Sequence, residues 1–144
     1  MEPENICIDT DLIIDFTKDI EPGAGCFEFV HEKFNCFITA ISAYELRFGV
    51  EYAGRKQDIE VLEELLGNLT ILPFDNAAAK VSAQIDAKLT KQGKKLSIKD
   101  IFIACICISN NIHFLTRNIR HFSPIPGIKV LSLEEIISSK GADR

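Results

Sequence analysis

Two aspartates stand at places where a buried carboxylate needs a cation beside it. Asp9 closes the short apolar run 6–8, and Asp100 opens a long apolar helical segment that leads into another apolar run ending at Thr116. A carboxylate at the end of a buried strand is costly unless a positive charge lies next to it. These residue types and positions predict a metal-dependent site.

The elements that must position these side chains alternate along the chain. Segments rich in β-branched and aromatic residues are expected to be strands, at 5–9, 36–40, 69–74, 112–116 and 128–132. Helical patterns lie between most of them, at 27–34, 42–53, 58–66, 76–91 and 97–110, with a last short helix after Ser132. Glycine and proline segments such as 22–25 and 123–127 mark the breaks. Strands that alternate with helices predict an α/β fold with a parallel sheet.

Ligands of an open parallel sheet bind beyond the carboxyl ends of its strands. Asp9 follows the first expected strand, and the turn Thr116-Arg117-Asn118 follows the fourth. Glu45 and Asp100 are expected in the first turns of their helices, where the side chains and the positive helix ends face the same crevice. The sequence therefore predicts that these residues share one edge of the sheet.

Glu45 and Asp100 also have a purely structural interpretation. Residues 42–45 and 97–100 have the form of a helix-capping box, the second with Asp in place of Glu or Gln. Residues 132–135 have the same form and carry no candidate function. Spacing alone does not decide between a capping role and a functional role for these two acids.

Length and composition predict one ordinary globular domain over residues 1–144. The chain is 47% hydrophobic and 26% charged, which excludes a disordered or fibrous protein. The N-terminus lacks the pattern of a signal peptide, and no apolar run approaches the roughly 18–20 residues that span a bilayer. We expect a cytoplasmic protein with no membrane partner. The five cysteines lack metal-ligand spacing and are expected to be reduced core residues.

The formal net charge of −5 disfavours a broad nucleic-acid-binding face. Metal ions that neutralise clustered acids would weaken this objection, and so would basic residues gathered near one edge. The basic residues considered for such an edge are Arg47, Arg55, Lys56, Lys94, Lys95, Arg117 and Arg120. The charge of the whole chain therefore does not exclude a nucleic-acid substrate.

Four segments, taken in order, resemble the successive motifs of the PIN domain family. They are Ile8-Asp9-Thr10, residues 38–46, residues 100–104 and residues 115–118, and together they extend over nearly the whole chain. Within that family, the size, the motif order and the segment 116–122 most resemble the VapC-like ribonuclease toxins of prokaryotic toxin–antitoxin pairs. Each motif alone is weak, whereas four in order at fitting intervals are fairly specific.

The resemblance implies a three-layer α/β/α fold around a five-stranded parallel sheet in the order 3-2-1-4-5. It also implies endonucleolytic cleavage of RNA at a site that binds Mg²⁺ (or Mn²⁺), a homodimer and a cognate antitoxin. Asp9 and Asp100 match the family's principal metal ligands, and Glu45 matches the acid that completes the catalytic cluster. The positions matched to the rim of the site, in contact with RNA, are Thr10, Thr116, Arg117, Asn118 and His121.

One departure from the family concerns its last motif. Many relatives have a further acid at the position of His121 or of Asn118, and this chain has neither. We expect either three acids completed by the Asn118 amide oxygen or water, or a second ion that binds weakly until RNA phosphate supplies ligands. His31 and His113 are expected to have packing or surface roles, whereas His121 is a candidate for the rim.

Two other functions remain open at this point. Ile8-Asp9-Thr10-Asp11 resembles the start of haloacid-dehalogenase-like phosphatases, in which the first Asp is the nucleophile and the second an acid. That family expects Thr or Val at the position of Ile13 and a late acidic pair where Asp100 stands alone. The second alternative is a PIN domain without activity that only binds RNA or a partner protein.

A partner face is expected on the helices between residues 42 and 66. Tyr44, Tyr52 and Leu62 lie there among polar residues and are candidates for the dimer contact, although such a stripe also suits ordinary core packing. The antitoxin is expected to insert a segment near the acidic crevice and to aim an Arg at the carboxylates.

Overall fold

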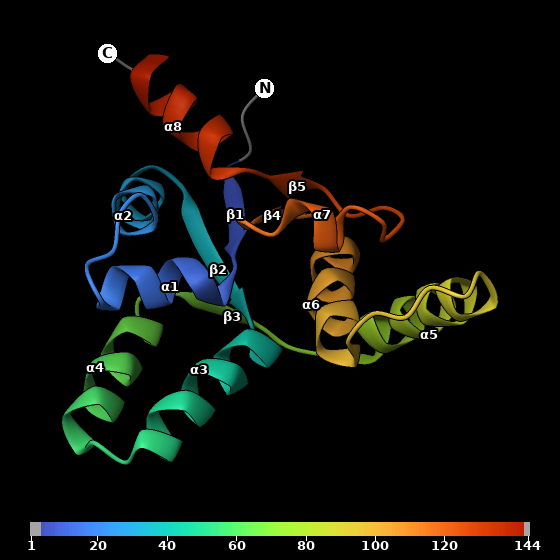
Figure 1. The fold of residues 1–144 in the computed structure, drawn as a ribbon, viewed down its shortest axis with the longest axis horizontal. Helices are drawn as coiled ribbons and strands as arrows, with labels where there is room; N and C mark the ends of the chain where they lie inside the picture. Colours follow the sequence, from blue (N-terminus) through green and yellow to red (C-terminus); the bar gives the residue numbers. More distant parts are fainter. Residues whose placement is uncertain (1–3, 143–144) are drawn as a thin grey trace.

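The computed structural model describes residues 4–142 and shows a parallel sheet between layers of helices (Figure 1). The strands are β1 (Asn5–Ile8), β2 (Asn35–Thr39), β3 (Thr70–Leu72), β4 (His113–Leu115) and β5 (Val130–Leu131). They form one five-stranded sheet in the order β3-β2-β1-β4-β5, and every neighbouring pair is parallel. The expected fold class and strand order are therefore confirmed.

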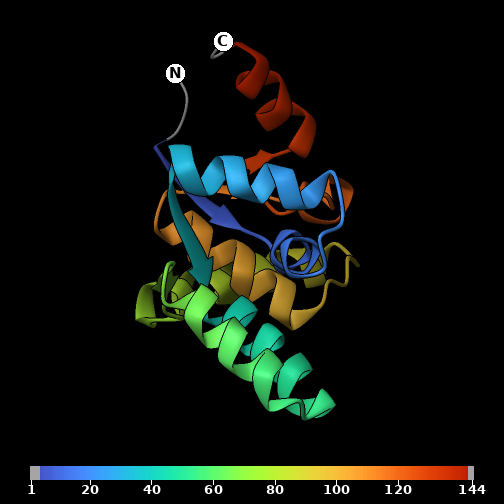
Figure 2. The same cartoon turned by 90° about the vertical axis from the view of Figure 1, so that its left-hand side faces the viewer.

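Helices cover both faces of this sheet. They are α1 (Thr10–Thr17), α2 (Gly23–Lys33), α3 (Ala40–Ala53), α4 (Lys56–Leu66), α5 (Asn76–Lys91), α6 (Ile98–Ser109), α7 (Ile119–Phe122) and α8 (Leu133–Ala142). One buried cluster joins α1, α2 and α8 to the sheet, and a second joins α5, α6 and α7 to its other face. The hairpin of α3 and α4 extends from the carboxyl end of β2 (Figures 1 and 2).

The apolar run at the N-terminus forms the centre of the sheet because it can bury side chains on both faces. Ile6, Cys7 and Ile8 are all fully buried. Ile6 and Ile8 belong to one cluster and Cys7 to the other, as the alternation of side chains along a strand requires. A strand covered on both faces must be apolar throughout. This arrangement places the end of β1, and Asp9 after it, in the middle of the molecule.

The expected core residues are confirmed. The helix α6 is buried on most sides, with Ile101, Ile103 and Ile106 each no more than 1% exposed. All five cysteines are buried. Within residues 4–142, no helix combines the length and the apolar character needed to cross a membrane.

The helices differ from the expected ones at three places. The short helices α1 and α7 were not expected, and α2 begins at Gly23 inside the segment that was predicted to be a break. The start of α2 packs against the buried side chain of Asp15 on α1, where a Cβ atom on Gly23 would lie 2.0 Å from Oδ2. Gly23 is therefore not part of a loop: it begins α2 and allows that helix to approach α1 closely.

The expected partner face also needs correction. Leu62 is only 4% exposed and belongs to the core, so it takes no part in a surface stripe. Tyr44, Phe48 and Tyr52 instead form an exposed aromatic row along α3, with ring centroids 6.3 Å and 5.9 Å apart. Residues four apart lie on the same side of a helix, so this row is continuous.

We expect Gly23→Ala to destabilise the protein by about 1–3 kcal/mol, because the added methyl group must displace the buried Asp15 side chain. Gly49→Ala is the matched control. Gly49 lies inside α3, and nothing beyond its own helix backbone lies within 4 Å of the place that a methyl group would take. Alanine there is expected to stabilise the protein by about 0.5–1 kcal/mol. Urea unfolding of both variants measures the difference, and equal stability for the two would contradict the packing described here.

Candidate functional site

Asp9 and Thr116 meet where the two central strands end. β1 pairs with β4 so that Ile8 lies opposite Leu115, and these are the last residues of the two strands. The residues that follow them, Asp9 and Thr116, therefore lie side by side. The Thr116 hydroxyl donates a hydrogen bond of 2.7 Å to Oδ2 of Asp9. Thr116 is fully buried and Asp9 is 7% exposed, so this contact is shielded from water. It fixes the Asp9 carboxylate at the edge of the sheet.

Asp9 also caps the helix that follows it. Its Oδ1 accepts a hydrogen bond of 2.8 Å from the backbone N–H of Thr10, the first residue of α1. Burial nevertheless raises the pKa of Asp9 above its ordinary value, and the negative charge of Asp11 adds to the rise, while the bonds from Thr116 and Thr10 lower it. The carboxylate is thus held in place but is not fully compensated as an anion.

Glu45 lies in the second turn of α3 rather than in the first, because α3 begins at Ala40. Thr39 is the N-cap, and its hydroxyl accepts a hydrogen bond of 3.0 Å from the backbone N–H of Ser42. The capping box that the sequence suggested over residues 42–45 does not form. Glu45 therefore has no capping role in this structure, and its side chain is free for another one.

Asp100 lies in the first turn of α6, as expected. Ser97 is the N-cap of that helix but makes no side-chain capping bond, so the second expected box is absent too. The third box does form, since Ser132 and Glu135 exchange hydrogen bonds of 3.1 Å and 3.2 Å at the start of α8. The box without a candidate function is thus the one that acts as a cap.

The three acids influence one another electrostatically. Burial raises the pKa of Glu45, and the charges of Asp100 and Asp9 raise it further, whereas Lys99 lowers it. The Lys99 ammonium lies 3.5 Å from Oε2 of Glu45. His121 Nε2 lies 2.6 Å from Oδ2 of Asp100. The structure therefore brings Asp9, Glu45 and Asp100 to one edge of the sheet and places a basic side chain against two of them.

The donor set at this edge suits a hard divalent cation, because it consists of carboxylate oxygens whose mutual repulsion a cation would relieve. As the side chains stand, no three Asp, Glu, His or Cys residues among those described are close enough together to hold a metal ion. Lys99 and His121 each contact one oxygen of a carboxylate, Oε2 of Glu45 and Oδ2 of Asp100 respectively.

Four of the five residues expected at the rim lie beside the candidate acids, and Arg117 does not. Thr10 and Thr116 bond to Asp9, and the backbone N–H of Asn118 donates a hydrogen bond of 2.9 Å to the Thr116 hydroxyl. His121 contacts Asp100. Arg117 turns elsewhere, because its Nη1 lies 2.6 Å from Oδ2 of the buried Asp15. Arg117 thus anchors the loop after β4 to α1.

Sequence reasoning missed two residues near the site, Asp15 and Lys99. Asp15 is a lone acid within the largely apolar segment 12–16, and that isolation was a usable signal. Lys99 carried no signal of its own, since its contact with Glu45 depends on how α3 and α6 pack.

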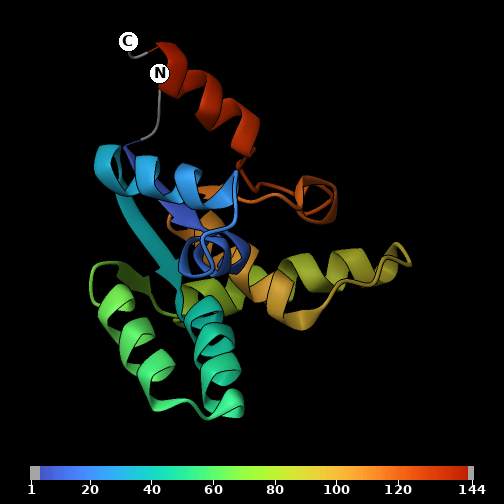
Figure 3. The same cartoon turned by 60° about the vertical axis from the view of Figure 1, so that its left-hand side comes forward.

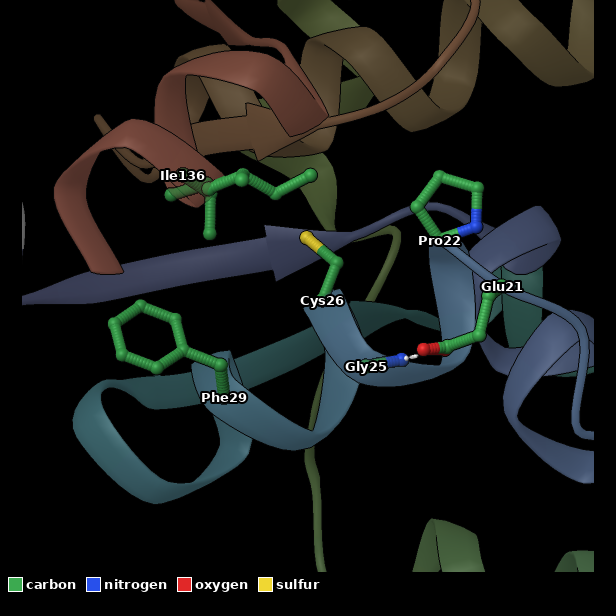
Figure 4. Close-up of a pocket in the computed structure, with 7 residues that line it drawn as sticks. Glu21, Pro22, Gly25, Cys26, Phe29 and Ile136 are labelled. Carbon is green, nitrogen blue, oxygen red and sulfur yellow. Dashed lines mark hydrogen bonds between the residues drawn. The ribbon is translucent and has the colours of Figure 1, made fainter. Parts of the chain in front are cut away.

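A cavity of about 200 Å³ lies between α2 and α8, away from these acids (Figure 4). Its lining includes Cys26, Phe29 and Ile136 and one carboxylate, Glu21, which accepts a hydrogen bond from the Gly25 N–H. It contains none of the candidate site residues. An apolar lining with one occupied carboxylate does not offer the groups that phosphodiester hydrolysis needs.

Comparison with known proteins agrees with this geometry. The model of the PIN domain family matches residues 6–127. The tRNA(fMet)-specific endonuclease VapC of Salmonella typhimurium is 31% identical over 109 residues, which cover 72% of this chain and 83% of that protein. Ribonuclease VapC3 of Methanocaldococcus jannaschii is 34% identical over 98 residues, which cover 67% of this chain and 97% of that protein.

A solved structure has the same fold. The crystal structure of DNA-bound VapBC from Salmonella typhimurium superimposes with a TM-score of 0.79 at 26% identity, covering 91% of this chain and 99% of the other. The family match extends over most of the chain, and both sequence relatives exceed 30% identity over more than two thirds of their own length. The protein therefore belongs to the PIN domain family and, within it, to the VapC-like ribonucleases.

Proposed function

We propose that this protein is an endoribonuclease that hydrolyses phosphodiester bonds of RNA at Asp9, Glu45 and Asp100, and that it is the toxin of a toxin–antitoxin pair. The observation that carries the proposal is the gathering of these three acids at the carboxyl ends of the central strands. There the charges of Asp9 and Asp100 raise the pKa of Glu45, and Asp9 is buried. Groups whose pKa values are shifted by such neighbours are typical of active sites.

Bound Mg²⁺ or Mn²⁺ would supply a Lewis acid that activates water and stabilises the charge that develops on the phosphate. Asp9 and Asp100 would hold the ion, with Asp9 kept in place by Thr116 and Thr10. Glu45 would orient the attacking water and accept its proton, for which a raised pKa is suitable. The Asn118 amide and water would complete the ligands, because no further acid lies in this loop.

Lys99 and His121 would have two successive tasks. In the free protein the Lys99 ammonium pairs with Glu45, and His121 Nε2 contacts Asp100. When the cation and the RNA arrive, both side chains can turn to the phosphate, since Lys99 is 49% exposed and His121 is 36% exposed. This exchange would replace one set of polar contacts by another and would leave no carboxylate without a partner.

The phosphatase alternative is not favoured, because the chain belongs to the PIN domain family and not to the haloacid dehalogenases. A PIN domain without activity remains the contrary outcome of the assays below. The named activity of the Salmonella relative makes tRNA(fMet) the first RNA to test.

We expect Asp9→Asn and Asp100→Asn each to lower the cleavage of tRNA(fMet) by at least about a hundredfold, because each removes an anionic ligand of the metal. EDTA should abolish cleavage by the wild type. Asp11→Asn is the matched control and should retain activity, since Asp11 only repels Asp9. Cleavage that survives EDTA or both Asn variants would falsify the proposed mechanism.

A second measurement is independent of activity. Added Mn²⁺ should raise the melting temperature of the wild type, because an ion that binds only the folded protein stabilises it. The same addition should have little effect on Asp9→Asn. An equal shift in both proteins would place the ion elsewhere.

The acid limb of the pH–activity profile should depend on Thr116. Asp9 must be ionised to hold the cation, and its pKa is already raised by burial, so activity is lost as the pH falls through that raised pKa. Thr116→Val removes the hydrogen bond that lowers this pKa and should move the acid limb to higher pH. Thr116→Ser keeps the hydroxyl and should restore the wild-type profile, whereas an unshifted profile in Thr116→Val would show that Asp9 does not control it.

The exposed aromatic row on α3 suits a contact between two copies of the chain, which is the homodimer that we propose. We expect the wild type to have twice the 16.1 kDa mass of one chain in light scattering. Phe48→Arg places a charge in the middle of the row and should give a monomer. Val61→Arg, an equally exposed apolar position on α4, is the control and should leave the mass unchanged. A dimer that persists in Phe48→Arg would exclude this face.

An antitoxin is the partner that the toxin role requires. A neighbouring short gene would be its source, and co-expression with it should suppress RNA cleavage by the wild type. An Arg aimed at the acids could replace Lys99 and His121 as their partner.

A further inference from the structure

Residues 88–99, here called the lysine arm, concentrate positive charge in an otherwise acidic protein. The arm contains five lysines and no acid: Lys88, Lys91, Lys94, Lys95 and Lys99. Its formal charge is +5, and the remaining 11 basic and 21 acidic residues give the rest of the chain a formal charge of −10. Such segregation gives one surface a positive potential that the net charge conceals.

The arm has a defined conformation that projects from the body of the molecule. α5 ends at Lys91, and Gly93 reverses the chain with a φ of +73°, a conformation that favours glycine. The backbone N–H of Lys94 donates a hydrogen bond of 2.9 Å to the carbonyl of Leu89, which is 1% exposed. The tip of the arm extends beyond α6 in Figures 1 and 3. Its lysines are exposed on a turn that is anchored in the core.

Three of the other basic residues considered for this role, all arginines, are already neutralised. Arg47 pairs with Glu63 at 2.8 Å, and Arg55 pairs with Asp58 at 2.9 Å. Arg117 pairs with Asp15. Among the described residues, by contrast, the first four lysines of the arm form no ion pair. Their charge is therefore available to a ligand.

Helix capping does not explain the arm completely. Lys88 and Lys91 lie in the last turn of α5, where cations stabilise the helix dipole. Lys94 and Lys95 lie beyond the helix end, where that effect has ended. Lys99 is next to Asp100 and contacts Glu45, so the arm leads from its tip directly into the candidate site.

We propose that the lysine arm binds the phosphate backbone of the RNA beside the bond that is cut. This proposal rests on the proposed function. Lysine ammonium groups bind phosphates as point charges, and a row of them follows a nucleic-acid backbone without reading its sequence. A protein partner fits the arm less well, because the cores of protein interfaces are depleted in lysine. The arm therefore supplies affinity, and the acids supply the chemistry.

The test is the salt dependence of RNA binding by the full chain. Lys94→Gln/Lys95→Gln is made in an Asp100→Asn background that does not cut RNA, and binding to tRNA(fMet) is measured by fluorescence anisotropy between low and moderate KCl. Lys18→Gln/Lys33→Gln is the control, because it changes the charge equally at two exposed positions, the C-cap of α1 and the last residue of α2.

We expect the arm variant to bind roughly tenfold more weakly, and its slope of log affinity against log salt to fall by about 1–2. The control should bind like its parent. With Asp100 intact, the arm variant should show a raised KM and an unchanged kcat. Equal binding by the arm variant and the control would overturn the proposal, and so would a loss of antitoxin binding without a loss of RNA binding. With either of these outcomes, the proposed function still stands if the wild type cuts RNA. A wild type that neither binds nor cuts RNA would overturn both the proposed function and the role of the lysine arm.

Discussion

The hydrogen bond from Thr116 to Asp9 is the contact on which the arrangement of the site depends. It joins residues 107 positions apart and exists only because β1 and β4 are neighbours in the sheet. β2 lies on the other side of β1 and ends in Thr39, which caps α3 and so sets the position of Glu45. The strand order therefore decides which side chains surround Asp9, and the hydrogen bonds from Thr116 and Thr10 decide how its carboxylate is oriented.

Two kinds of contact to acidic side chains surround this hydrogen bond, and they differ in burial. Asp15 is buried, and its pairing with Arg117 fixes the loop that carries Thr116 and Asn118. Removing one partner of such a pair leaves a buried charge, so it serves to hold structure in place. Lys99 is exposed and His121 is half-buried, and they contact Glu45 and Asp100. Contacts near the surface contribute little to stability, so they can be exchanged as the proposed function requires.

The three capping-box patterns show how far a local pattern can be trusted. The segments 42–45, 97–100 and 132–135 have the same form, yet only the last makes the reciprocal bonds. At α3, Thr39 has already capped the helix, and at α6, Asp100 contacts His121 on α7 instead of closing on Ser97. In each case a residue distant in sequence or on a preceding strand changed the role of the acid. The acids that failed to cap are the ones that gather near Asp9.

The pattern of apolar runs and helix signals determined the α/β class, the five strands, and the extent of α5, because these depend on local periodicity and on the burial that it permits. The motif resemblance added the strand order and the identity of the candidate acids. Only the tertiary structure decided that Gly23 begins a helix, that Arg117 faces Asp15 and that Lys99 faces Glu45. Each of these depends on the distance between elements that pack against one another, and a side chain's partner across such a contact is not encoded in the residues beside it.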